Sequence, residues 1–504
     1  MQQPNIIFIM TDTQATNMIG CYAGQDLNTN HIDNLADNAV RFNSAFTTSP
    51  VCTPARAGIF TGIFAQNSGP WSNNLPLGKN IRTMGQYFKK AGYNTAYVGK
   101  WHLDGHDYFG TGICPDEWDK EYWYDGINYL NDLTEEEILL WRNGLNSLED
   151  IEEHNITAEF TWAHRISNRG IDFLSKQKKK SPFLLVLSYD EPHHPFTCPA
   201  EYIRKYQDFA YDLHGKQDDD LSSKPAHQRH WSEAMGYPKS PDGKYRHPLY
   251  FACNDYVDDE IGRVLDSLSD EDRKNTWIIF TSDHGEMMGA HRLISKGANA
   301  YDDIARIPLI IQPPLNQPVS QQIETPVSHI DLLPTMLDIA GIKVPDILQG
   351  ESLLPLVTGS NPNKKYSVMV SFNRYEIEHD SFGGFIPMRA WVSDDYKLVI
   401  NLFDTDELYD RNNDPYEMHN LIDNPKYTAI RNKLHDDLYA YMEKTRDSFR
   451  TYQFMLRPWR EDKGVEWMGL FRPKPDDGVS PIVRDYDTGL KTKGVKTEKK
   501  NLSF

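Results

Sequence analysis

The sequence predicts an α/β protein with a large, mostly parallel or mixed central sheet flanked by helices, followed by a smaller C-terminal α+β domain with a short antiparallel sheet. Three observations support this fold class. Continuous apolar runs recur along the first part of the chain, as is typical of strands buried on both faces of a sheet. Helical patterns such as Ile81–Ala91 and Tyr256–Leu268 lie between those runs. From about residue 365, shorter runs separated by turn residues replace this alternation.

Five apolar runs are the expected strands of the large sheet. They are residues 5–10, 94–98, 183–188, 276–281 and 307–311. Ligands of such sheets bind beyond the carboxyl ends of the strands. Side chains suited to catalysis follow four of these runs in turn: Asp12, Lys100, His193 and Asp283. We therefore expect these four segments to build one site.

The C-terminal part of the chain follows a different pattern. Short strands are expected at residues 366–372, 390–392 and 397–402, the last two being separated by turn residues. A helix is expected at residues 427–446. This combination of short strands and one helix is typical of a small α+β domain.

We therefore expect three regions along the chain: a catalytic domain over 1–360, a smaller α+β domain over 365–450 and a C-terminal extension over 451–504. The extension ends in the Lys-rich run Lys491–Lys500, which is expected to be a solvated tail. The polar stretch Asp208–Arg229 is expected to form a long surface loop.

Composition excludes several classes of partner. The net charge of −19 and the pI near 5.3 argue against a nucleic-acid-binding protein, which needs clustered Lys and Arg. No apolar stretch reaches the ~18 residues that a membrane span requires. The five cysteines allow zero to two disulfides if one of them is modified, so they indicate no disulfide framework. No signal peptide is evident, so we expect a periplasmic or secreted protein if a signal has been removed and a cytoplasmic one otherwise.

One short run carries the strongest functional signal. Cys52-Thr53-Pro54-Ala55-Arg56, followed by Thr61-Gly62, contains the Cys-x-Pro-x-Arg pattern that formylglycine-generating enzymes read when they oxidise a cysteine to an aldehyde. The alternative for a lone cysteine of this kind is a buried structural residue. Here the pattern is joined by four other runs in a fixed order. They are Thr11-Asp12-Thr13-Gln14, Gly99-Lys100-Trp101-His102, Pro192-His193-His194-Pro195-Phe196 and Ser282-Asp283-His284-Gly285-Glu286.

Taken together, the five runs resemble the type I sulfatase family of the alkaline phosphatase superfamily, over roughly residues 4–425. The resemblance implies that Cys52 is the precursor of a formylglycine and that Arg56 stabilises it. One hydroxyl of the aldehyde hydrate would attack sulfur, and the other would later expel the sulfate. It also implies a formylglycine-generating maturation enzyme as a partner.

The resemblance further implies a metal site made by Asp12, Cys52, Asp283 and His284. Many family members have a second aspartate in the first run, whereas this chain has Thr13 and Gln14, either of which would then supply a neutral oxygen. Oxygen ligands favour Ca²⁺, with Mg²⁺ as the alternative. The imidazole of His284 also suits Mn²⁺ or Zn²⁺.

The remaining matches imply roles at the sulfate group. Lys100 would hold a sulfate oxygen, and His102 would act as the base when sulfate is eliminated. His193 would bind sulfate, and Lys296, in Ser295-Lys296-Gly297, would be the second lysine at the sulfate. Either His193 or Lys296 would protonate the leaving oxygen. His194 is the less favoured histidine of its run, with a turn role or a substrate contact as its alternatives.

Substrate recognition is weakly marked in the sequence. Asn73 and Asn74 are speculative substrate-binding residues, because they precede the helix that leads to Lys100. Trp71, Trp123, Trp231 and His379 are further candidates, although a Trp is more often a core residue.

These residues favour a sulfuric ester hydrolase that acts on a sulfated mono- or oligosaccharide as an exo-acting enzyme. Three alternatives remain: a phosphonate or phosphate monoester hydrolase of the same superfamily, a sulfamidase acting on an N-sulfate, and a catalytically silent binding protein. The missing second aspartate fits the phosphonate hydrolases, whereas Lys100 and His102 favour a sulfatase. The complete set of catalytic residue types argues against a silent protein.

Overall fold

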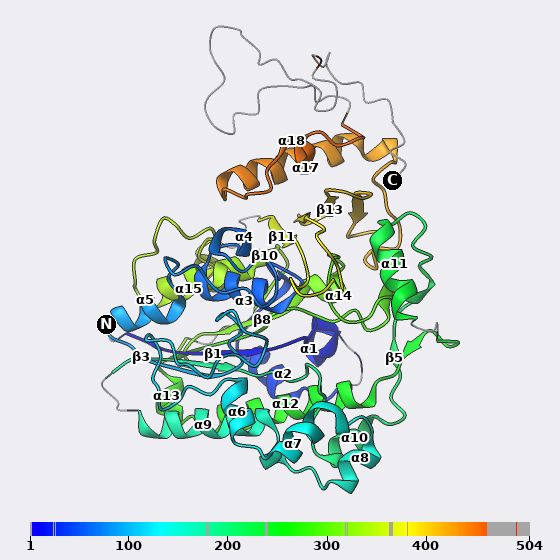
Figure 1. Ribbon diagram of the computed structural model, residues 1–504. Coiled ribbons are helices and arrows are strands. Elements are labelled where there is room, and N and C mark those ends of the chain that lie inside the picture. The colour runs from blue at the N-terminus through cyan, green and yellow to red at the C-terminus, as the bar shows by residue number, and fades with distance from the viewer. Residues whose placement is uncertain are drawn as a thin grey trace.

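The computed structural model describes residues 3–460, apart from 24, 26, 178–180, 237–239, 318, 320, 362–365 and 381, together with residue 490. Over these residues an eight-stranded sheet lies between two layers of helices, and a four-stranded sheet stands beside it (Figure 1). The predicted class, an α/β domain with a smaller antiparallel sheet, is confirmed.

Four parallel strands form one side of the large sheet. β1 (Asn5–Thr11) pairs with β4 (Phe183–Ser188) and with β7 (Thr276–Ser282), and β3 (Asn94–Gly99) pairs with β4. All four coincide with expected apolar runs. Because parallel strands end at the same edge of a sheet, the residues that follow them lie close together.

The other side of the large sheet is mixed. β8 (Arg306–Gln312) runs antiparallel to β7, and β2 (Val40–Phe46) runs antiparallel to β8. β2 was not expected, because polar and partly exposed residues interrupt its apolar ones. Two short strands, β9 (Gln321–Ile323) and β10 (Val327–Ser328), pair in parallel with β2.

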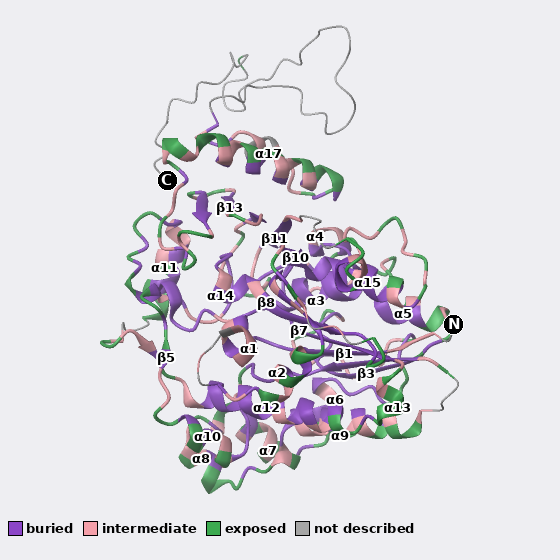
Figure 2. Ribbon diagram, turned by 180° about the vertical axis from the view of Figure 1, so that it is seen from behind, coloured by how far each residue is buried: buried purple, intermediate pink, exposed green. Residues whose placement is uncertain are grey.

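Helices cover both faces of the large sheet (Figures 1 and 2). One layer consists of α2 (Asn30–Asp37), α9 (Trp162–Lys176) and α12 (Pro248–Asp266), and the opposite layer of α3 (Cys52–Thr61), α5 (Met84–Lys90) and α15 (Leu332–Ile339). β1 alternates between the two cores: Ile7 and Ile9 face the first layer, and Phe8 and Met10 the second. Among the described helices, none is both long and apolar enough to cross a membrane.

The second sheet belongs to the C-terminal part of the chain. Its strands β11 (Val368–Phe372), β12 (Met388–Val392), β13 (Tyr396–Asn401) and β14 (Glu407–Asp410) are each antiparallel to the next. The helix α17 (Thr428–Lys444) packs on one face of this sheet (Figure 2).

The opposite face of the second sheet packs against the first domain. Val370 and Met388 share a hydrophobic cluster with Met287 and Tyr301, which follow β7. The connection between β11 and β12 also contacts the first domain: the Ala298 N–H donates to the carbonyl oxygen of Phe382 at 3.1 Å. The second sheet thereby lies against the segment that follows the carboxyl end of β7.

Two other segments had been expected to be a loop and a C-terminal extension. The stretch 208–229, expected as a loop, contains β5 (Tyr211–Asp212), a short 3₁₀ turn and the first residues of α11 (Ala226–Met235). Its polarity was misleading, because the charges of Lys216 and Lys224 are buried against acidic partners. Of the expected extension, only residues 451–460 and 490 are described, and the Lys-rich end lies outside the described residues.

Candidate active site

The helix α3 carries Cys52 as its first residue, and every residue of this helix is buried. The Oδ1 of Asn73 accepts the Thr53 N–H at 3.1 Å and so satisfies one donor of the first turn. The helix ends at Gly62, whose φ of 64° is the left-handed conformation that favours glycine. The thiol therefore lies at a fixed helix N-terminus, where the helix dipole favours negative charge.

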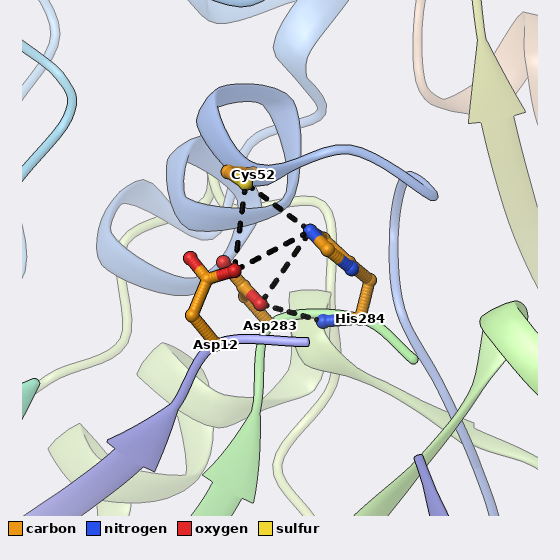
Figure 3. A group of neighbouring side chains, drawn as sticks. All are labelled: Asp12, Cys52, Asp283 and His284. Carbon is orange, nitrogen blue, oxygen red and sulfur yellow. Dashed lines mark hydrogen bonds and ion pairs between the residues drawn. The ribbon is translucent and has the colours of Figure 1, made fainter. Parts of the chain in front are cut away.

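Asp12, Cys52, Asp283 and His284 form a compact cluster (Figure 3). One ligand atom from each lies within 4.8 Å of all the others, and all four residues are buried. The Cys52 Sγ is 3.2 Å from His284 Nε2 and 3.7 Å from Asp12 Oδ1. Asp12 follows β1, Asp283 and His284 follow β7, and Cys52 begins α3. The fold thus brings together segments more than 200 residues apart in sequence.

The orientation of His284 suits a metal ligand. Its Nδ1–H donates to the Gly285 carbonyl oxygen at 2.9 Å, so Nε2 of the neutral ring keeps its lone pair. That lone pair faces the cluster, with Nε2 3.7 Å from Asp283 Oδ1 and 3.8 Å from Asp12 Oδ1. Burial lowers the pKa of this imidazole, which favours the neutral form that binds metals.

Two buried cations neutralise the aspartates. Arg56 donates from Nε to Asp283 at 3.1 Å and from Nη2 to Asp12 at 3.0 Å. Lys100 Nζ lies 2.9 Å from Asp12 Oδ2. Burial alone would raise the pKa of Asp12, but Lys100 and the other nearby cations hold it well below its ordinary value. For Asp283, burial and then the charge of Asp12 raise the pKa to about 7.

Lys296 and His193 form a proton-sharing pair beside the thiol. Lys296 Nζ donates to Cys52 Sγ at 2.6 Å and lies 3.0 Å from His193 Nε2. His193 donates its Nδ1–H to the carbonyl oxygen of His194 at 2.6 Å, so its Nε2 accepts from Lys296. Burial and then Lys100 lower the pKa of His193 well below its ordinary value. The proton of this pair is therefore held by Lys296.

His102 has one ring nitrogen, Nδ1, that is free to accept a proton. Its Nε2–H donates to Asn74 Oδ1 at 3.0 Å, and its buried Nδ1 has no hydrogen-bond partner among the described residues. Burial and then Lys100 lower its pKa, so Nδ1 is an unprotonated acceptor. The backbone of His102 has a φ of 57°, a conformation that non-glycine residues adopt rarely and mostly where neighbours fix it.

Comparison with known proteins identifies the family of the chain. A family model described as sulfatase matches residues 4–342, which is more than half of the chain. The chain belongs to the sulfatase family. A second model, described as the C-terminal part of N-sulphoglucosamine sulphohydrolase, matches residues 289–444. The protein is thus a hydrolase of sulfate esters, and the family resemblance expected from the sequence is confirmed.

Individual relatives extend over nearly the whole chain. An Escherichia coli K12 protein called an uncharacterized sulfatase, YidJ, is 64% identical over 505 residues, covering 100% of both chains. An ulvan-active sulfatase of Formosa agariphila is 29% identical and covers 91% of this chain and 84% of its own.

Solved structures share the fold at low sequence identity. One, a complex with its substrate D-glucosamine-2-N,6-O-disulfate, has a TM-score of 0.72 at 21% identity and covers 89% of this chain and 99% of its own. The phosphonate monoester hydrolase of Agrobacterium radiobacter has a TM-score of 0.71 at 22% identity, with coverage of 88% and 96%. At such identities the likeness concerns the fold alone.

The candidate metal ligands Thr13 and Gln14 and the candidate substrate residues Asn73 and Asn74 lie in different surroundings. Thr13 donates its hydroxyl to Asp12 Oδ1 at 2.7 Å, so it adjoins the cluster. Gln14 points elsewhere: its Oε1 accepts from Thr11 at 2.8 Å and its Nε2 donates to Asn254 at 2.7 Å. Of the two neutral-oxygen alternatives, only Thr13 is thus beside the metal-ligand set. Asn73 and Asn74 do not face open space, because their amide oxygens bind the N–H of Thr53 and His102.

Sequence reasoning missed several residues of the site. Asp190 is buried and lies 2.9 Å from Lys100 Nζ, which it shares with Asp12. The ring of Tyr108 lies 5.0 Å from the same Nζ. Asp190 lies two residues before Pro192 and was detectable by its place after β4, but Tyr108 stands in a region with no recognisable pattern.

Glu376 reaches the site of the sulfatase from the smaller domain. Asn73 and Glu376 form an isolated parallel bridge, and Asn74 Nδ2 donates to the Glu376 carboxylate. That contact fixes the Asn74 amide so that its oxygen faces His102, and the tautomer of His102 with Nδ1 free follows from it. Glu376 is therefore a positioning residue.

Replacing Glu376 by glutamine should lower kcat about tenfold with KM little changed, because a glutamine amide lets the Asn74 side chain turn over. The limb of the pH–rate profile that reports His102 should shift with it. The matched control is Glu378→Gln, an exposed residue of the same connection. Equal kcat and pH profiles in the two variants would contradict the positioning role.

Proposed function

We propose that this sulfatase hydrolyses a sulfate ester of a carbohydrate, using a formylglycine made from Cys52 and a divalent metal. The observation that carries the proposal is the position of the Cys52 sulfur. It lies at a buried helix N-terminus and contacts both His284 of the cluster and Lys296. The buried, inert position of a structural cysteine would not need a cation at hydrogen-bond distance.

The residues present fit a divalent cation. Two carboxylates and the lone pair of His284 converge with the Cys52 side chain. Burial and then the neighbouring charge of Asp12 raise the pKa of Asp283, and a bound cation would offset both effects. Oxygen ligands favour Ca²⁺, with Mg²⁺ or Mn²⁺ as alternatives. When bound, such a cation polarises the sulfate oxygens and stabilises negative charge in the transition state. Asp12, Asp283 and His284 would hold it together with the modified residue at position 52.

A formylglycine at position 52 would add water to form a hydrate, and one hydroxyl of that hydrate would be the nucleophile at sulfur. The other hydroxyl would expel the sulfate as the aldehyde re-forms. Around it, Lys100 and Lys296 bind the sulfate oxygens by charge-assisted hydrogen bonds. Lys296 holds the proton of the pair with His193, and this pair hands a proton to the leaving sugar oxygen. His102 accepts a proton at its free Nδ1 when the sulfate is released.

The carbohydrate substrate is supported by relatives whose names specify glycans, such as the ulvan-active sulfatase of Formosa agariphila and the N-acetylglucosamine-6-O-sulfatase of Bacteroides thetaiotaomicron. A phosphonate or phosphate monoester hydrolase is the alternative. The absence of a second aspartate, at the position of Thr13, favours it. The pair of Lys100 and His102 favours the sulfatase reaction.

The experiment that tests the proposal is mass spectrometry of the Cys52 peptide, from protein produced with a formylglycine-generating enzyme. Oxidation to the aldehyde should lower the peptide mass by about 18 Da. The matured protein should then hydrolyse sulfated saccharides in preference to phosphonate and phosphate monoesters. An unmodified thiol in the presence of a competent maturase, or a preference for phospho-esters, would refute the proposal.

A further inference from the structure

A small pocket lies beside His194, the residue that follows His193 of the site. It has a volume of about 270 Å³ and is lined by Arg142, Asn146, His194 and His247, with Phe196 among its apolar walls. This volume suits a group of monosaccharide size rather than a longer ligand. Over the part of the chain that the structure describes, no carboxylate lines the pocket.

Arg142 supplies the positive charge of this pocket. It stands on η2 (Leu140–Gly144), a single wide turn of π-helix, a feature that occurs often at functional sites. Its guanidinium lies over the rings of Tyr108, Phe109 and Trp141, with its carbon 5.0–5.7 Å from their centroids. Arg142 is exposed and donates from Nη1 to the Tyr108 hydroxyl. Among the described residues no carboxylate pairs with it, so its charge is not neutralised.

The pocket lies beside the catalytic groups, because two of its lining residues neighbour side chains of the site. The His194 ring lies 4.2 Å, centroid to centroid, from the ring of His193. Arg142 and Lys100 also approach the same ring of Tyr108: the Arg142 guanidinium carbon lies 5.4 Å from its centroid and Lys100 Nζ 5.0 Å. A group bound at Arg142 would therefore belong to the sugar whose sulfate lies at Lys100, or to its immediate neighbour.

The two histidines of the pocket add neutral donors. His247 accepts the Tyr250 N–H at Nδ1 at 3.2 Å, so its proton is on Nε2. Burial, followed by the charges of Lys296 and Lys100, lowers the pKa of His194 to about 4. At neutral pH both rings therefore donate N–H groups without adding charge, and Arg142 remains the cation of the pocket.

We propose that this pocket binds a second anionic group of the substrate, a carboxylate or a further sulfate, so that the enzyme selects saccharides carrying two anionic groups. The proposal rests on the function proposed above, because it concerns the sugar bound at the same site. The net charge of −19 makes a local cation necessary, since the field of the whole protein repels a doubly anionic sugar. An Arg held by aromatic rings offers the bidentate geometry that sulfate and carboxylate groups accept.

The test is calorimetric binding of two matched pairs of sugars to the Cys52→Ala protein, in which turnover does not consume the ligand. Glucosamine 6-O-sulfate is compared with glucosamine 2-N,6-O-disulfate, and glucose 2-O-sulfate with glucuronic acid 2-O-sulfate. In at least one pair the second anionic group should strengthen binding about tenfold or more, the gain expected from one charge-assisted hydrogen bond. The pair that responds identifies the source as sulfate or carboxylate.

Arg142→Gln should remove this gain, and Arg142→Lys, which keeps the charge, should retain part of it. Arg82→Gln is the matched control: Arg82 is also exposed and lines a different pocket, beside α5. It should leave the gain intact. The proposal is overturned if neither pair shows a gain, or if the gain survives Arg142→Gln. Because binding is measured without turnover, this result is independent of the mass and activity measurements on Cys52.

Discussion

Replacing Cys52 by alanine is expected to abolish sulfate ester hydrolysis, with a loss of roughly 10⁴-fold or more in kcat. Alanine provides neither the sulfur that is oxidised nor any nucleophile, while the remaining groups can still bind sulfate. The fold should survive, because the change removes a single buried atom, the sulfur, at the first residue of α3. The measurement is kcat on 4-nitrophenyl sulfate and on a sulfated saccharide, with melting temperature as the check on folding.

Cys114→Ala provides the matched control for this loss. Cys114 is partly buried and packs against the core, and its thiol lies within hydrogen-bond distance of the carbonyl oxygens of Pro115 and Trp118. Both its activity and the mass of its Cys52 peptide should equal those of the parent protein. Full activity in Cys52→Ala would show that residue 52 plays no part in catalysis, whatever the mass of the Cys52 peptide in the parent protein.

Replacing Arg56 by glutamine is expected to lower the free energy of unfolding by about 3–5 kcal/mol, the usual result of removing one partner from a buried charge cluster. Asp12 and Asp283 would then stand close together with one compensating cation fewer. Activity should fall as well, since both are proposed metal ligands. Because a divalent cation neutralises the same two carboxylates, adding Ca²⁺ should restore much of the lost melting temperature.

The control for this prediction is Arg389→Gln in the smaller domain. Arg389 is fully buried and pairs with Asp447 at 2.7 Å and 3.0 Å, so its loss should destabilise the protein to a similar extent. It lies outside the cluster, so Ca²⁺ should not selectively restore its stability. An equal response of both variants to Ca²⁺ would argue against a cation at Asp12 and Asp283.

Much of the core chemistry could be predicted from the sequence because each residue belongs to a short run. Asp12, Lys100 and Asp283 directly follow apolar strands, and parallel strands that end at one edge bring such residues together. Strand β2 could not be predicted this way, since it lies at the antiparallel side and polar residues interrupt its pattern. The bonding of Asn73 and Asn74 was equally hidden, because an amide type does not reveal its partner.

Contiguous residues with fixed spacing were enough to predict the family, the fold class and the groups that surround Cys52. The orientation of these groups, in contrast, depends on tertiary contacts: the free Nδ1 of His102, the lone pair of His284 and the proton on Lys296. Tertiary contacts also bring Glu376 from the region of the second sheet and Arg142 from η2 beside them. Hydrogen-bond partners and charge neighbours are set by distances between segments that are remote along the chain, and local spacing does not encode those distances.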